Sequence, residues 1–133
     1  MIIREIKNQF LSLVDALNRI DGDAWADFYS IDGFISAMVG TDYYQSRAKF
    51  ISAIKEYFSM RETQKVTPVE IQVTVLQEDL ALMISSEKSE MQMKDGVTIV
   101  SDHTFSMLWK KEDAGWKIIH SHESWIDTAA AQQ

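Results

Sequence analysis

Two kinds of hydrophobic periodicity divide the chain near residue 60. Before that point apolar residues recur every three or four positions, a spacing typical of amphipathic helices. After it, apolar and polar residues alternate, which is typical of β-strands. The pattern predicts helices over residues 2–20, 24–29 and 46–60, the last two capped by Asp23 and Ser46, with a short strand over residues 34–39 between them.

The second part of the chain predicts an antiparallel meander of four strands. Short polar turns separate its β-rich segments, and Asp95-Gly96 favours a tight hairpin. Gly115 can take a left-handed conformation after a turn over residues 112–114, which sets the register of the last hairpin. The strands are expected over residues 66–76, 80–93, 97–111 and 116–125, with Glu112 facing Trp116, Leu108 facing His120, Ser106 facing His122 and Thr104 facing Ser124.

The last predicted strand carries two histidines. Read with a period of two, it places His120 and His122 on the same face as Trp116 and Ile118, and the register adds Ser106 to that face. A pair of imidazoles lining a cavity can exchange protons near neutral pH. We therefore expect the even-numbered face to line a pocket. The alternative is that these histidines are hydrogen-bonded wall residues without chemistry.

The hairpin register has an alternative too. A turn longer by one residue would invert every side chain and bring His103, Phe105, Met107 and Trp109 to the histidine face. In the preferred register His103 points away, so a metal site built from His120, His122, His103 and Asp102 is not expected. Glu87 and Glu90 are expected on the solvent face of the sheet.

Helices followed by one long sheet indicate an α+β fold, in which a curved antiparallel sheet is covered by the three N-terminal helices. A ligand pocket would form in the covered hollow, with the helices as its lid and the final strands as its floor. The chain has 133 residues, which suits one domain over residues 1–127, followed by a frayed tail over residues 128–133.

Composition and net charge argue against several classes of binding partner and catalytic chemistry. The net charge of −7 disfavours nucleic acid and anionic membranes, and no apolar run is long enough to span a bilayer. A cytoplasmic location is the expectation. The absence of cysteine excludes thiolate catalysis and Cys-based metal sites, and phosphate-binding glycine loops and a nucleophile elbow are also absent. We expect no cofactor and no metal, so an enzyme here would work by acid–base catalysis.

One string resembles a known family. Ser106 to Ser124, with a charged turn, Trp116 and a His-x-His-x-Ser ending, resembles the nuclear transport factor 2-like superfamily, in particular its SnoaL-like and ketosteroid-isomerase-like branch. The resemblance covers nearly the whole chain. It implies a cone-shaped α+β barrel with a pocket at its open end and dimerisation through the outer sheet face. A similar ending occurs in the association domain of calcium/calmodulin-dependent kinases, which is an assembly module.

The first functional hypothesis is a domain that binds a small hydrophobic ligand. If it is an enzyme, it would be an acid–base isomerase, cyclase or dehydratase acting on a hydrophobic carbonyl compound. The competing hypothesis is a non-catalytic dimerisation or ligand-sensing module. The candidate catalytic residues are His120, His122 and Asp102, and the candidate ligand-binding residues are Trp25, Tyr29, Tyr44, Ser106 and Ser124. The homodimer is expected through an outer apolar patch of Phe105, Met107, Trp109, Ile119 and Trp125.

Overall fold

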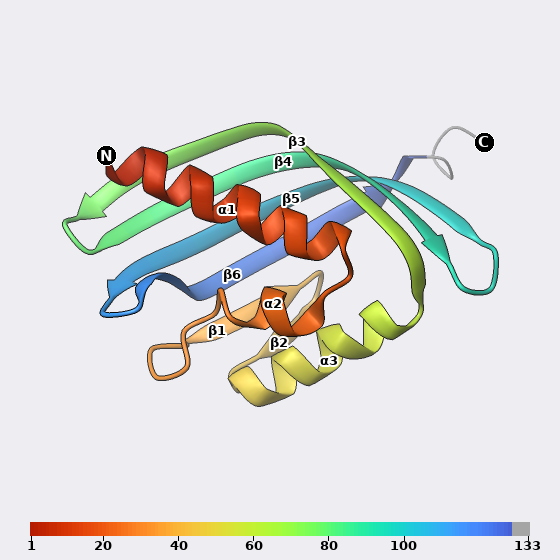
Figure 1. The fold of residues 1–133 in the computed structure, drawn as a ribbon, viewed down its shortest axis with the longest axis horizontal. Coiled ribbons are helices and arrows are strands. Elements are labelled where there is room, and N and C mark those ends of the chain that lie inside the picture. Colours follow the sequence, from red (N-terminus) through yellow and green to blue (C-terminus); the bar gives the residue numbers. More distant parts are fainter. Residues whose placement is uncertain (129–133) are drawn as a thin grey trace.

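The computed structural model describes residues 1–128 and contains three helices and one six-stranded sheet. The long strands run side by side and curve together, with the first helix lying across one face (Figure 1). The elements in chain order are α1 (Ile2–Asn18), α2 (Gly22–Ala26), β1 (Ser36–Val39), β2 (Asp42–Tyr44), α3 (Arg47–Ser59), β3 (Arg61–Gln77), β4 (Leu80–Met93), β5 (Thr98–Glu112) and β6 (Gly115–Asp127).

The α+β class and the four-stranded meander are confirmed, but the sheet is not purely antiparallel. Its order is β2-β1-β6-β5-β4-β3, and β1 pairs in parallel with β6 from Ser36 and His120 to Val39 and Glu123. β6 would otherwise present a free edge with unpaired backbone groups, and β1 satisfies them. The β1–β2 hairpin turns at Gly40, which has a φ of 59°.

The helix boundaries follow local capping chemistry. The Ser46 side chain accepts a hydrogen bond from the Lys49 amide at 3.3 Å, as predicted for the N-cap of α3. The prediction for α2 was wrong by two residues, because Asp21 rather than Asp23 accepts the amide of Ala24, at 3.0 Å. An Asp two residues earlier gives an equivalent cap, so the sequence alone does not separate them.

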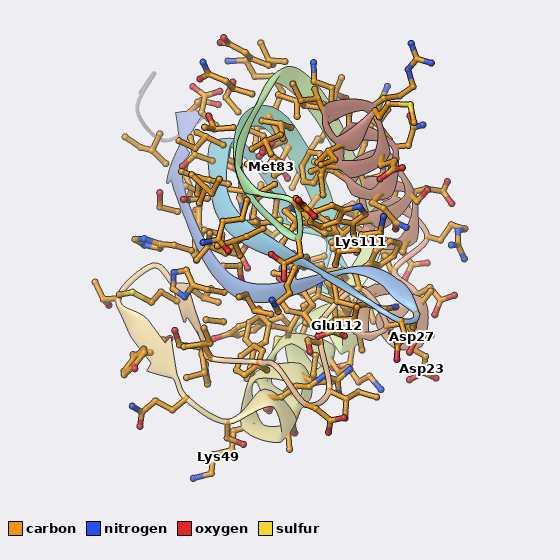
Figure 2. The ribbon with its side chains drawn as sticks, turned by 90° about the vertical axis from the view of Figure 1, so that its left-hand side faces the viewer. Asp23, Asp27, Lys49, Met83, Lys111 and Glu112 are labelled. Atoms are coloured by element: carbon orange, nitrogen blue, oxygen red, sulfur yellow. The ribbon has the colours of Figure 1, made fainter. Side chains whose placement is uncertain are left out.

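The core lies between α1 and the concave face of the sheet. Phe10 and Leu13 are fully buried, and the Phe10 ring packs edge-on against Phe105 with centroids 5.8 Å apart. Met83 sits within the curve of the sheet on the side of α1, whereas Lys49 projects away from α3 into solvent (Figure 2). The alternation of buried and exposed positions along β4 and β5 is the two-residue period expected of a half-buried sheet.

A β-bulge in the last hairpin changes which residues share a face. The pairs Leu108 with His120 and Ser106 with His122 are confirmed, but Glu112 pairs with Gly115 rather than with Trp116. The one-residue difference is made up at Ile119, where the register shifts between Trp109 and Leu108. Because an extra residue reverses the alternation of side chains, Trp116 and Ile118 face inward while His120 and His122 face outward.

The prediction that the even-numbered face lines the pocket was therefore wrong. The concave face of β5 carries Phe105, Met107 and Trp109, at most 6% exposed, so these three cannot form an outer dimer patch. A strand buries its most apolar face, and that face of β5 is the odd-numbered one. Ile119 is also buried, and only Trp125, at 50% exposed, remains accessible. Homodimerisation itself stays a prediction.

Glu87 was also placed wrongly. It is 2% exposed, on the concave face of β4, rather than on the solvent face. The expected tail, residues 128–133, lies outside the described residues except for Thr128, whose hydroxyl donates to the Val100 carbonyl at 3.3 Å. Within residues 1–128, none of the helices is long and apolar enough to cross a membrane.

Candidate functional site

A cavity of about 660 Å³ opens on the concave side, at the end of the sheet where α3 leads into β3. Its size is within the range of small-molecule sites. The C-terminal part of α3, the start of β3 and the end of β4 form one wall, and β5, β6 and the β1–β2 turn form the other. Most of the lining is apolar, including Trp25, Ile54, Phe58, Met91, Met93 and Phe105.

One cluster of charged side chains interrupts this apolar lining. The His103 ring lies between two carboxylates, with Nδ1 at 3.2 Å from Glu87 Oε1 and Nε2 at 2.9 Å from Glu123 Oε2. The three residues come from β4, β5 and β6, three neighbouring strands in the sheet. His103 pairs across the strands with Glu87 on one side and Trp125 on the other. The Trp125 ring is nearly parallel to the His103 ring, with centroids 6.2 Å apart.

The carboxylates control the protonation of His103. Burial by itself lowers the pKa of this histidine, because it disfavours the charged imidazolium. The hydrogen bonds and charges of Glu123 and Glu87 outweigh burial and raise the pKa to about 9, from an ordinary value of 6.5. At neutral pH both ring N–H groups of His103 therefore donate, one to each carboxylate.

The two carboxylates differ in their access to the cavity. Glu123 lines it, with its side chain 20% exposed, whereas the Glu87 side chain is fully buried behind His103. The second oxygen of Glu87 has no hydrogen-bond partner among the described residues. A molecule in the cavity can thus approach Glu123 and His103, while Glu87 acts on it only through the histidine.

Two of the residues predicted from the sequence line this cavity, namely Trp25 and Ser124. Tyr29 lies deeper, 2% exposed, with its ring 5.2 Å from that of Trp25 and its hydroxyl 3.2 Å from Ser121 Oγ. Burial, with a smaller contribution from the charge of Glu123, raises the pKa of this hydroxyl far above its ordinary value. Tyr44 packs against Phe50, with ring centroids 5.7 Å apart, and is not part of the lining.

The remaining candidates lie on the outer face of the sheet. His120 Nδ1 is 2.8 Å from the hydroxyl of Ser36 on β1, and Asp102 forms an exposed ion pair with Lys88. Ser106 pairs with His122 across the two strands on that same face. These four candidate residues therefore lie on the convex side, separated from the cavity by the sheet. Ser106 is paired with His122, whereas Asp102 lies further along β5 and is not in contact with either histidine.

The sequence did contain a signal for the cluster that was missed. Glu87 stands two residues after Ser85 and four after Met83 in a strand whose odd-numbered positions are small or apolar. A carboxylate in such a series is buried, and a buried carboxylate needs a charged or hydrogen-bonding partner. Among residues 1–128, no group of three or more histidine, aspartate or glutamate side chains has the arrangement of a metal site.

Comparisons with known proteins agree with this architecture. The sequence model of the SnoaL-like domain family matches residues 6–128. No curated protein matches the chain in sequence. The fold is similar to that of a proposed dehydratase of the nuclear transport factor 2-like family from Streptomyces avermitilis, with a TM-score of 0.82 at 14% identity over 93% of this chain and 95% of that one.

Two further solved structures share the fold. A proposed scytalone dehydratase from Novosphingobium aromaticivorans has a TM-score of 0.82 at 11% identity, over 92% of this chain and 83% of that one. A proposed association domain of calcium/calmodulin-dependent protein kinase II from Xanthomonas campestris has a TM-score of 0.78 at 21% identity, over 92% and 86%. Identities this low establish the fold alone, and one fold carries many unrelated functions.

Proposed function

Because the chain belongs to the SnoaL-like domain family, whose fold carries the cavity described above, we propose that it binds a small, largely apolar carbonyl compound there and moves a proton on it. The chemistry would be that of an acid–base isomerase, cyclase or dehydratase. The observation that carries the proposal is the Glu87–His103–Glu123 cluster, which lies against a largely apolar cavity.

The cluster contains two acidic side chains and one basic side chain. Two carboxylates and one imidazolium carry a net charge of −1 at neutral pH, and most of their surface is removed from water. Such a cluster is suited to act as a general base.

Glu123 is the member positioned to take the proton. It borders the cavity, and its second carboxylate oxygen makes no hydrogen bond within the described part of the chain. His103 holds the other oxygen and fixes the orientation of the carboxylate, while Glu87 fixes His103 from behind. Glu123 is thus the catalytic residue of the proposal, and Glu87 is a positioning residue.

The carbonyl of the substrate makes this proton transfer feasible. Removal of a proton from the carbon next to a carbonyl group gives an enolate, in which the negative charge moves to the oxygen. Return of the proton to a different carbon is an isomerisation. Transfer of the same proton to a hydroxyl group on the β-carbon, which then leaves as water while the carbon–carbon double bond forms, is a dehydration. The dehydratases among the structural neighbours support this class of reaction as an expectation for the chain.

The proposal can be tested before the natural substrate is known. A small apolar ketone such as 2-tetralone is incubated with the protein in D2O, and deuterium incorporation next to the carbonyl is followed by mass spectrometry. The wild-type protein should accelerate exchange above the buffer rate, and Glu123→Gln should reduce that acceleration by a factor on the order of 100. Glu90→Gln, the same change at an exposed position of β4, is the matched control and should exchange like the wild type.

The outcomes separate the two functional classes. If a panel of apolar ketones shows no exchange above buffer, or if Glu123→Gln exchanges as fast as the wild type, proton transfer by this cluster is wrong. Ligand binding without exchange, seen as a shift of the His103 resonances, would favour the ligand-sensing alternative.

A further inference from the structure

The start of β3 presents an arginine to the cavity, opposite the acid–base cluster. Arg61 lines the cavity, and its guanidinium lies over the Phe58 ring, 5.3 Å from the centroid. One of its Nη1–H groups donates to Gln64 Oε1. Gln64 is itself 7% exposed, and its amide donates to the Leu17 carbonyl at the end of α1, at 3.1 Å. The guanidinium is therefore held between the Phe58 ring of α3 and Gln64, whose amide is anchored to the end of α1.

Within the part of the chain that the structure describes, this guanidinium forms no ion pair with a carboxylate. Among residues 1–128, no carboxylate oxygen lies within 4 Å of it, and Gln64 is its only hydrogen-bond acceptor. Other arginines in the chain are differently placed: Arg19 pairs with Asp15 and Asp21, and Arg47 donates to two backbone carbonyls. Burial lowers the pKa of Arg61, an unfavourable effect that is only partly offset by the charges of Glu123 and Tyr57.

The charges facing the cavity are distributed unevenly. Arg61 is on the wall formed by α3 and β3, whereas Glu123 is on β6, paired with His103 on the neighbouring β5. The other acids of the lining, Asp42 and Asp127, are exposed and belong to the β1–β2 hairpin and the end of β6. The cavity lining therefore carries a cation on the wall formed by α3 and β3 and a carboxylate on the wall formed by β6.

We infer that Arg61 binds the carboxylate of the ligand, so that the cavity accepts a small hydrophobic carboxylic acid with its carboxylate toward β3 and its reactive carbon toward Glu123. This inference rests on the proposed function, since it names the class of molecule that the same cavity takes. Arginine has planar, paired N–H donors that match a carboxylate, and preorganised donors lose little entropy on binding. The like charge of Glu123 disfavours the reversed orientation.

The test compares three probes that differ in one group: 4-phenylbutyrate, its amide 4-phenylbutyramide, and 4-phenylbutan-1-ol. Binding is measured by calorimetry at pH 7 to the wild type, Arg61→Gln, Arg61→Lys and the control Arg19→Gln, with thermal melts to verify folding. The wild type and the control should bind the carboxylate at least about tenfold more tightly than the amide, the gain expected of a charged hydrogen-bond pair. Arg61→Gln should lose that preference without weakening the amide, and Arg61→Lys should keep part of it.

Two results would overturn the inference: an amide or alcohol that binds the wild type as tightly as the carboxylate, or a carboxylate preference that survives in Arg61→Gln. Failure to detect any binding of 4-phenylbutyrate at millimolar concentration would overturn it as well. These outcomes are independent of deuterium exchange on 2-tetralone, which carries no carboxylate. If the protein catalyses deuterium exchange but shows no preference for the carboxylate, the proposed function stands without a role for Arg61. If it prefers the carboxylate but catalyses no exchange, the cavity is an anion-binding site without proton transfer.

Discussion

Both faces of the β5–β6 hairpin carry histidines, but the side chains that surround these histidines differ. On the concave face, His103 is enclosed by two carboxylates, which raise its pKa to about 9. On the convex face, His120 is half-buried and contacts the hydroxyl of Ser36, and His122 pairs across from Ser106. A local motif such as His-x-His therefore does not identify the histidine that the fold surrounds with carboxylates.

The difference between the faces depends on one residue. Ile119 is the extra residue of the β-bulge, and it allows Trp116 and Ile118 to face the core although His120 and His122 face outward. Without it, strict alternation would place all four on one side.

Deletion of Ile119 should have the largest effect. The strand would have to expose Trp116 and Ile118 or turn the outer histidines inward, and exposing two large buried side chains costs about 3–6 kcal/mol. We expect loss of soluble folded protein, measured by expression yield, circular dichroism and urea unfolding. Ile119→Val keeps the bulge and should cost only about 1 kcal/mol. A stable deletion variant with native-like spectra would show that the bulge does not set the faces.

Substitution of two neighbouring residues on β5 compares how much side-chain burial on each face contributes to stability. Trp109 is fully buried on the concave face, so Trp109→Ala should lower the free energy of unfolding by about 3–5 kcal/mol. Leu108, its neighbour on the convex face, is partly exposed, and Leu108→Ala should cost about 1 kcal/mol. Both are measured by urea unfolding at pH 7. Equal costs at the two positions would contradict the assignment of the faces.

The pH dependence of stability should report on His103. Its pKa is raised in the folded state, so its stabilising contribution is complete below about pH 6.5 and is lost as the pH rises to about 9. The difference corresponds to at most about 3 kcal/mol. Urea unfolding between pH 6 and 9.5 should show this loss in the wild type and in His122→Gln, the matched change on the outer face. The slope should disappear in His103→Gln, and a slope that remains there would assign it to another group.

A substitution on the outer face should change the oligomeric state of the protein rather than the stability of its fold. Ile84 is 49% exposed on β4, and its neighbours Leu82 and Leu108 pair across the strands. If a second copy covers this face, Ile84→Lys should give monomers in light scattering while changing the unfolding free energy by less than about 0.5 kcal/mol once the dimer contribution is removed. A wild-type protein that is already monomeric at high concentration would end the homodimer prediction.

Local patterns in the sequence were sufficient for the elements and the family. The stripe from Ile6 to Leu17 predicted α1, the Ser46 cap predicted α3, and alternation predicted β4 within the bounds observed. The string from Ser106 to Ser124 indicated the superfamily, and the match to the SnoaL-like domain confirmed it. These features depend on contacts between residues close in sequence, such as caps, turns and amphipathic faces, so one chain is enough to predict them.

The residues of the candidate site come together through contacts that local patterns do not predict, although the burial of Glu87 could be inferred from the pattern of β4 alone. Glu87, His103 and Glu123 are 16 and 20 residues apart and meet only because three strands pair in one register. Arg61 reaches the same cavity from the far edge of the sheet. The bulge at Ile119 could not be predicted from local patterns either. It is favoured by the burial of Trp116 and Ile118 against the core, and not by any conformational preference of the strand itself. Local sequence patterns predict which segments become helices and strands, whereas packing across the sheet sets which side of each strand meets the cavity.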